Sequence, residues 1–367
     1  MRQIPLTSPD IHDVDIEAVT AVLRTGMLVQ GINVNNLEQS IAAFINAEHV
    51  HAVANGTATM HLALTALGIG KGDEVIVPAF SYVATANVVE LVGATPIFVD
   101  IDLATFNIDV TKIESAITPN TKAIIPVHEF GLACDIEYVM QIANKYGLAV
   151  IEDAACALGA KQNDKFVGTF GTFGSFSLHP RKAISSGEGG LLVSGTSDLA
   201  KEIGILRNHG IDYIDGKMEF VAAGFNYRLT DFQAALVNSQ LKRLANTIEY
   251  KRELAEVYFQ ELKSSIITLP FVPEDRPHTW QTFHVLVANT YNRDELIADL
   301  KKKGIGTNYG AQCIPAQKYY LNKYKLNSKE LFPNALIAFN QGLALPIYEK
   351  LKGEDIQYIS SVLNNLT

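Results

Sequence analysis

The chain has 367 residues, of which 48% are hydrophobic and 19% are charged, a composition typical of a folded globular protein. At roughly 100–200 residues per domain, this length predicts two domains. Thirty basic and 39 acidic residues give a net charge of −9, which argues against nucleic-acid binding through a general positive field. An anionic ligand must therefore be held by local donors.

The three cysteines, Cys134, Cys156 and Cys313, have neither a Cys-x-x-Cys spacing nor the pattern of a disulfide framework. This is typical of a reducing compartment. Residues 1–13 lack the basic and then apolar run of a signal peptide, and no stretch approaches the roughly 20 apolar residues of a membrane span. We expect a soluble, cytoplasmic enzyme without a membrane partner.

The first two thirds of the chain alternate short β-branched runs with amphipathic helices. This alternation predicts an α/β fold with a mainly parallel sheet covered on both faces. One helix is delimited by its caps, because Asp135 can start it and Gly147 can end it. In chain order we expect a strand at 51–53, a helix at 57–67, a strand at 74–77, a helix at 84–91, strands at 95–99 and 122–127, the helix after Asp135, and strands at 148–151, 173–178 and 191–193.

The pattern changes after about residue 243. A long helix at 244–262 is followed by one clear strand at 283–287 and by helices at 293–303 and 355–363. This order predicts a smaller C-terminal α+β domain. We therefore expect a large domain at 1–243 and a small one at 244–367.

Two segments could hold a phosphate or carry chemistry. Gly56-Thr57-Ala58 opens the helix at 57–67, where free N–H groups and the helix dipole favour an anion, although Thr57 could equally be a simple N-cap. Lys182 lies among small, hydroxyl and glycine residues, where a lysine can form a Schiff base with a carbonyl. On that segment alone, a solvated surface loop is the favoured interpretation. Asp153 follows a predicted parallel strand, at the end where such sheets bind ligands.

Taken in order, these segments resemble the DegT/DnrJ/StrS sugar aminotransferases, which are pyridoxal-phosphate (PLP) enzymes of the aspartate-aminotransferase fold, fold type I. The similarity covers almost the whole chain. The matching segments are Gly56-Thr57-Ala58, Asp73 to Pro78, Ala84 to Asn87, Gly93 to Pro96, Ile151 to Ala155, Lys182, Gly187-Glu188-Gly189-Gly190, Leu206 to Gly210 and Asn226-Tyr227-Arg228-Leu229.

The resemblance implies that Lys182 binds PLP covalently and moves the proton between substrate and cofactor. It implies that Asp153 pairs with the pyridine nitrogen and keeps the ring an electron acceptor. The expected phosphate contacts are Gly56, Thr57, Ala58 and Ser177.

Other positions are implied to complete the site. Tyr82 matches an aromatic residue stacked on the ring, with core packing as the alternative. Asn226 matches an asparagine that reaches the phosphate from a neighbouring subunit, which implies a homodimer with shared active sites. Arg228 is equally compatible with a cation for the nucleotide and with an interface residue. The site is not expected to contain a metal, because His49 and His51 lack a third ligand.

The chain departs from the family pattern at two places. Cys156 stands where relatives carry glutamine or histidine in contact with the cofactor ring or its oxygen, and we interpret it as a small buried residue rather than a nucleophile. The segment 308–315 differs from the family's substrate loop. Candidate substrate contacts are His179, Arg228, Asn308 and Tyr309.

We therefore expect an aminotransferase that passes an amino group from glutamate, through the pyridoxamine phosphate (PMP) form, to a keto group of a nucleotide-linked deoxysugar. The sequence Gly187-Glu188-Gly189-Gly190 favours the branch that aminates C4. A dehydratase or cyclitol aminotransferase of the same family is the first alternative. A non-catalytic regulatory member of the fold is the second. Lysine rather than histidine at position 182 favours transamination over dehydration.

Overall fold

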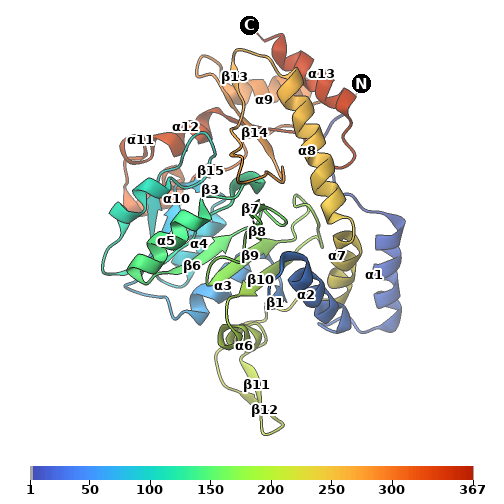
Figure 1. Ribbon diagram of the computed structural model, residues 1–367, viewed down its shortest axis with the longest axis vertical. Helices are drawn as coiled ribbons and strands as arrows, with labels where there is room; N and C mark the ends of the chain where they lie inside the picture. Colours follow the sequence, from blue (N-terminus) through green and yellow to red (C-terminus); the bar gives the residue numbers. More distant parts are fainter. Residues whose placement is uncertain (1–2, 367) are drawn as a thin grey trace.

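The computed structural model describes residues 3–366 and has a seven-stranded sheet at its centre (Figure 1). Five neighbouring strands run parallel, and the sixth, β10, is antiparallel to both of its neighbours. The expectation of a mainly parallel sheet is thereby confirmed. Across the sheet the strands are β1 (His49–Val53), β10 (Gly190–Ser194), β9 (Phe173–Ser177), β6 (Ala149–Asp153), β5 (Thr121–Ile124), β2 (Glu74–Pro78) and β4 (Thr95–Val99).

Both faces of this sheet are buried, as the strand sequences show. In β2, Val75 and Val77 pack into one apolar cluster, whereas Ile76 between them packs into another. Successive side chains of a strand point to opposite faces, so an unbroken apolar run marks a strand covered twice. The helices of this part are α1 (Asp13–Thr25), α2 (Ile32–Ile45), α3 (Gly56–Ala66), α4 (Ala84–Leu91), α5 (Ile136–Tyr146), α6 (Ser197–Leu206) and α7 (Asp231–Leu241).

Helix α5 has the caps expected from the sequence. The Asp135 carboxylate accepts a hydrogen bond from the Tyr138 amide, and Gly147 ends the helix in the left-handed conformation with φ of 67°. Ile136, Val139 and Ala143 are buried against the sheet. The prediction of this helix from one cap residue, one stop residue and one apolar face is confirmed.

Strand β5 is shorter than expected, ending at Ile124 instead of residue 127. Pro126 has no N–H group to donate and interrupts the ladder. The chain still follows the sheet, since the Ile125 amide donates to the Ile76 carbonyl and Val127 pairs with Asp153. The segment beyond the break therefore remains beside the carboxyl end of β6.

The C-terminal third begins with the long helix α8 (Leu244–Glu261) and includes a three-stranded sheet (Figure 1). Ile4 packs into the apolar cluster of this part and pairs with Ile305. The chain's beginning thus packs with its C-terminal third, and the division at residue 243 stays a prediction. The elements here are β13 (Ile267–Thr268), β14 (Phe283–Val287), β16 (Gly342–Leu345), α9 (Arg293–Lys302) and α13 (Gly353–Asn364).

Part of the C-terminal third lies on the central sheet instead. Residues Gln312–Cys313 form β15, which pairs antiparallel with β3 (Phe80–Ser81). Ile314, Tyr320 and Ala335 then join the apolar cluster of the central sheet. The helices here are α10 (Lys318–Tyr324), α11 (Ser328–Leu331) and α12 (Pro333–Gln341), and the remaining strands are β7 (Lys161–Gln162), β8 (Lys165–Phe166), β11 (Ile211–Ile214) and β12 (Lys217–Phe220).

Across residues 3–366, none of the helices combines the length and the apolar character needed to cross a bilayer.

Candidate active site

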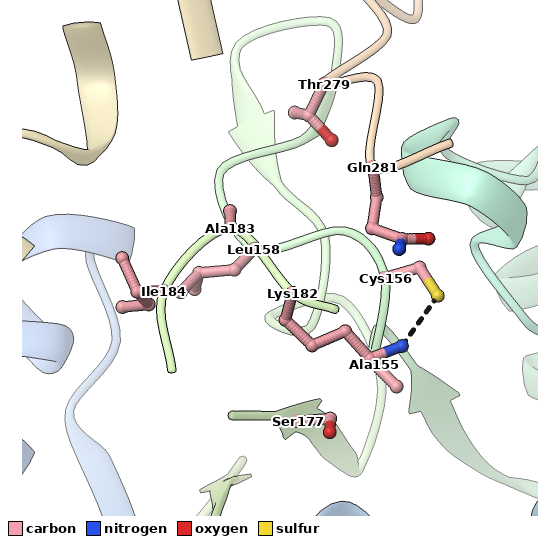
Figure 2. Close-up of a pocket in the computed structure, with 9 residues that line it drawn as sticks. All are labelled: Ala155, Cys156, Leu158, Ser177, Lys182, Ala183, Ile184, Thr279 and Gln281. Atoms are coloured by element: carbon pink, nitrogen blue, oxygen red, sulfur yellow. Dashed lines mark hydrogen bonds between the residues drawn. The ribbon is translucent and has the colours of Figure 1, made fainter. Parts of the chain in front are cut away.

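Three of the predicted site residues lie where β6 and β9 end or in the loop that follows β9. Asp153 is the last residue of β6 and Ser177 is the last residue of β9. The loop 178–189 that follows β9 carries Lys182, and Figure 2 shows this lysine directed toward Cys156. Parallel sheets bind ligands at this end of their strands, and three side chains predicted separately lie there.

The Lys182 Nζ atom donates a hydrogen bond to the Cys156 Sγ atom at 3.0 Å (Figure 2). Burial raises the pKa of the Cys156 thiol, although the nearby lysine lowers it. A thiol held in its neutral form is a weak nucleophile. Cys156 is half-buried where a buried residue was expected, and the contact favours a small packing residue beside the lysine over a nucleophile.

Asp153 is a buried carboxyl group with two donors. The Thr85 hydroxyl donates to Oδ2 at 2.8 Å, and the Ala155 amide donates to Oδ1 at 3.2 Å. Burial raises the pKa of the Asp153 carboxyl, while these donors and Lys182 lower it. A cation placed against this group would offset the cost of burying its charge. Thr85, on α4, belongs to the matching segment Ala84 to Asn87, but no role was predicted for it.

The N-terminus of α3 forms an open anion cradle. The Asn55 side chain accepts from the Ala58 amide at 2.8 Å, so the N-cap is Asn55, and the alternative that gave this role to Thr57 is wrong. Within residues 3–366 the amides of Gly56 and Thr57 have no acceptor. A Cβ atom at Gly56 would lie 3.0 Å from the Ser177 Cβ atom, so glycine keeps the cradle accessible.

Tyr82 follows β3 and is 66% exposed in this chain, which excludes the alternative that it packs in the core. The pairing of β15 with β3 brings the segment 308–313 beside it. Tyr309 is 40% exposed, and its hydroxyl accepts from the Gln312 side chain at 3.4 Å. The Asn308 side chain accepts from the Gly310 amide at 2.9 Å and so shapes the turn.

The other predicted contacts have partners within the chain. The His179 Nδ1 atom accepts from the Arg181 amide at 3.3 Å, and burial lowers the pKa of His179. Arg228 donates to the Asn208 side chain at 2.6 Å and pairs through its backbone with Val53, next to the cradle. Asn226 is exposed, and its contact with a neighbouring subunit stays a prediction.

The structure adds residues that the sequence did not point to. Thr279 and Gln281, from the segment before β14, line the same pocket as Lys182 and Cys156 (Figure 2). The Gln281 side chain donates to the Arg181 carbonyl at 2.9 Å. Glu129, beyond the end of β5, is buried and close enough to Asp153 and Lys182 to be influenced by both charges. The strand-end rule that selected Asp153 could have selected Glu129 too.

Comparisons with known proteins identify the family of the chain. The model of the DegT/DnrJ/EryC1/StrS aminotransferase family matches residues 9–364. Spr1654 from Streptococcus pneumoniae, assigned as a sugar aminotransferase and solved in PLP and PMP forms, is 28% identical, with TM-scores of 0.93 over 99% of this chain and 98% of that one. A family member from Brucella abortus is 32% identical over 96% of this chain and 94% of its own, with a TM-score of 0.89.

A third similar structure is PseC from Helicobacter pylori, an aminotransferase involved in the biosynthesis of pseudoaminic acid. It is 26% identical, with a TM-score of 0.92 over 99% of this chain and 98% of that chain. The family's cofactor, PLP, carries a phosphate, a basic ring nitrogen and an aldehyde, and the open cradle, Asp153 and Lys182 match these three groups in kind. The chain belongs to the DegT/DnrJ/EryC1/StrS aminotransferase family, with the architecture of PLP fold type I.

Proposed function

We propose that the protein is a PLP-dependent aminotransferase that moves an amino group from glutamate to the C4 keto group of a nucleotide-linked deoxysugar. The observation that carries the proposal is the placement of Lys182, Asp153 and the open N-terminus of α3 at one end of the sheet. The sugar class is supported by the neighbours Spr1654 and PseC.

Cofactor binding uses donors already free in this chain. The amides of Gly56 and Thr57, together with the Ser177 hydroxyl, would hold the phosphate without a lysine or arginine. The Asp153 carboxylate would accept a hydrogen bond from the ring nitrogen, and the Thr85 hydroxyl keeps that carboxylate in place. When bound, PLP supplies a carbonyl that accepts the amino group and a ring that withdraws electrons from the reacting carbon.

Lys182 has the second task, proton transfer. Its Nζ atom would take a proton from the substrate carbon and return it at the neighbouring carbon, as general base and then acid. The Cys156 contact orients this amine in the free protein. Tyr82, with an exposed ring, would cover one face of the ligand and exclude water from it.

Substrate selection falls to the rim of the pocket. Gln281 lies beside Lys182, and the segment 308–313 lies beside β3. With Arg228 next to the cradle, these groups could bind hydroxyl and phosphate groups of a sugar nucleotide. The preference for C4 rests only on the sequence Gly187-Glu188-Gly189-Gly190. We extend the proposal to the domain division at residue 243 and to a homodimer in which Asn226 reaches the partner's cofactor phosphate.

The test compares Lys182→Ala with a matched control, Arg181→Ala, which removes an exposed neighbouring cation. Protein loaded with PLP should show visible absorbance that shifts when glutamate is added. Lys182→Ala should lose the absorbance shift and at least about 10³-fold of the amine-transfer rate, since it removes both the attachment point and the base. Arg181→Ala should retain both.

A panel of keto sugar nucleotides, keto cyclitols and a dehydration assay then separates the alternatives. Turnover of a cyclitol alone, or loss of water without amine transfer, would replace the proposed substrate by one of the rival family reactions. A glutamate-induced shift without turnover of any acceptor would favour a regulatory member of the fold. A wild-type protein that binds no PLP would refute the proposal.

A further inference from the structure

Glu129 is a buried acid that the proposed mechanism does not yet use. The residue is 4% exposed, and among residues 3–366 its Oε2 atom has no hydrogen-bond partner. The backbone around it is fixed, because the Glu129 amide donates to the Asn107 side chain at 2.8 Å. Phe130 then takes a left-handed conformation with φ of 56°, which a residue with a side chain adopts at a cost. A buried carboxyl oxygen without a partner requires an explanation.

The groups that face Glu129 decide its charge. They are Asp153 from the end of β6, Lys182 and the thiol of Cys156, with the Ser81 hydroxyl next to the carboxyl. Burial and the negative charge of Asp153 raise the pKa of Glu129 to about 8, against the opposing effects of Lys182 and Ser81. At neutral pH the carboxyl therefore keeps its proton and can donate a hydrogen bond.

The strand order places Glu129 relative to the cofactor site. Strand β6, which ends at Asp153, lies between β9, which ends at Ser177, and β5, which precedes Glu129. Glu129 and Ser177 are therefore on opposite sides of Asp153. A ligand held with its phosphate at Ser177 and its ring nitrogen at Asp153 would have its other ring edge on the side of Glu129. In PLP and PMP that other edge carries the phenolic oxygen.

We propose that Glu129 is a cofactor-binding residue whose protonated carboxyl group donates a hydrogen bond to the phenolic oxygen of PLP and PMP. The inference rests on the proposed function, because it needs the phosphate at Ser177 and the ring nitrogen at Asp153. It gives the Oε2 atom the partner that it lacks in the free protein. The Glu129 carboxyl group would also supply the hydrogen-bond donor that the neighbouring Cys156 lacks, since a thiol is a weak donor.

The first experiment measures PMP binding to the apo-protein, since PMP carries the phenolic oxygen but cannot attach covalently to Lys182. Glu129→Gln keeps a donor and should bind within about threefold of wild type, whereas Glu129→Leu should bind about tenfold more weakly. The same three proteins are then titrated with 3-deoxy-PMP, in which hydrogen replaces the phenolic hydroxyl. With this analogue the difference between wild type and Glu129→Leu should fall to about twofold or less.

The outcomes separate this inference from the function it rests on. If Glu129→Leu loses equal affinity for both ligands, Glu129 acts through the structure, and the hydrogen bond to the phenolic oxygen is refuted. If wild type and Glu129→Leu bind PMP equally, Glu129 is not a cofactor contact, although the proposed function stands. If wild type binds no PMP, the proposed function fails together with the inference.

A second readout needs no ligand and remains valid if Glu129→Leu folds poorly. A carboxyl whose pKa is about 8 in the folded protein and ordinary in the unfolded chain keeps a proton that the unfolded chain releases. Wild type should therefore lose stability relative to Glu129→Gln as the pH rises from about 4.5 to 8, and the difference should be constant outside this range. Thermal unfolding of both apo-proteins at a series of pH values measures this difference in stability. Parallel curves across the window would show that Glu129 ionises normally and refute the proposed donor.

Discussion

At the scale of single residues, the site contains opposing charges at close range. Asp153 and Glu129 are both buried acids, and Lys182 is the cation that faces them. The Asp153 carboxylate has its own donors in Thr85 and Ala155, whereas Glu129 lacks a partner for one oxygen. The two acids thus have different environments: burial raises the pKa of both, and the donors around Asp153 oppose that rise.

Cys156 allows a prediction at this scale. Because burial raises the pKa of its thiol, we expect no covalent role for it in the reaction. Cys156→Ala removes one hydrogen bond to Lys182, worth about 1 kcal/mol, and should lower the amine-transfer rate by about fivefold. Steady-state kinetics of Cys156→Ala and Lys182→Ala, side by side, measure this. A loss in Cys156→Ala as complete as in Lys182→Ala would mean that the thiol is essential.

Individual site residues were predictable where a local rule applied. Asp153 lies at a strand end, and Lys182 lies in an ordered set of motifs. Gln281 gave no such signal, since it lies nearly one hundred residues after Lys182 and only packing brings it into the pocket. The N-cap of α3 was assigned to Thr57 in one interpretation, because a hydroxyl residue and the preceding Asn55 satisfy the same preference and only geometry separates them.

At the scale of elements, a single carboxylate fixes the turn that leads into β9. Glu152, on β6, accepts hydrogen bonds from the amides of Gly168 at 2.7 Å, Phe170 at 2.7 Å and Gly171 at 2.8 Å. His128 is 3.1 Å away through its Nε2 atom, and neither side chain is exposed. The His128 Nδ1 atom accepts from the Cys134 amide, so the ring proton faces Glu152. Strands β6 and β9 and the segment after β5 are therefore held in register below the site.

Removing this carboxylate should destabilise the fold. Glu152→Ala leaves the buried Gly168 amide, two partly buried amides and His128 without their acceptor, and we expect a loss of about 3–5 kcal/mol in the free energy of unfolding. Urea unfolding monitored by circular dichroism measures it. The control is Glu48→Ala, whose side chain is 93% exposed and should change stability by less than about 0.5 kcal/mol. A loss in Glu152→Ala below about 1 kcal/mol would show that water replaces the carboxylate.

Elements were predicted well where apolar pattern and caps agree, as in α5. The end of β5 was predicted wrongly. Pro126 ends the hydrogen-bonded ladder, although the chain keeps its direction and its apolar sequence beyond Ile124. The apolar pattern indicates which residues are buried, but it does not indicate which backbone groups form hydrogen bonds. A strand and an extended segment beside a strand therefore have the same pattern in the sequence. The short pairing of β15 with β3 depends on residues more than 200 positions apart and had no local signal.

At the scale of the whole molecule, apolar side chains remain exposed on the N-terminal part of this chain. Met27, Val29 and Ile32 are 73%, 65% and 65% exposed. Clustered exposed apolar residues are typical of interaction surfaces. Together with the implied role of Asn226, they support the proposed homodimer.

Light scattering should therefore give a mass twice the 40.1 kDa of one chain. Val29→Glu should shift the protein toward monomer and lower amine transfer, because a charge buried in an apolar interface is costly. The matched control is Leu321→Glu, an exposed leucine on α10 that should leave the mass unchanged. A fully active wild-type monomer would contradict the shared active site.

The loop that carries Lys182 has one more consequence. It connects two neighbouring antiparallel strands, its ends are joined by the pairing of Ser177 with Gly190, and the Leu178 amide donates to the Gly189 carbonyl at 2.8 Å. The lysine is thus tethered at both sides, and in the proposed reaction its amine would stay beside the pocket at an effective concentration on the order of millimolar or higher. In the proposed reaction, a free amine must exceed that concentration to compete with Lys182 unless it also binds the pocket through other groups, as the donor glutamate must.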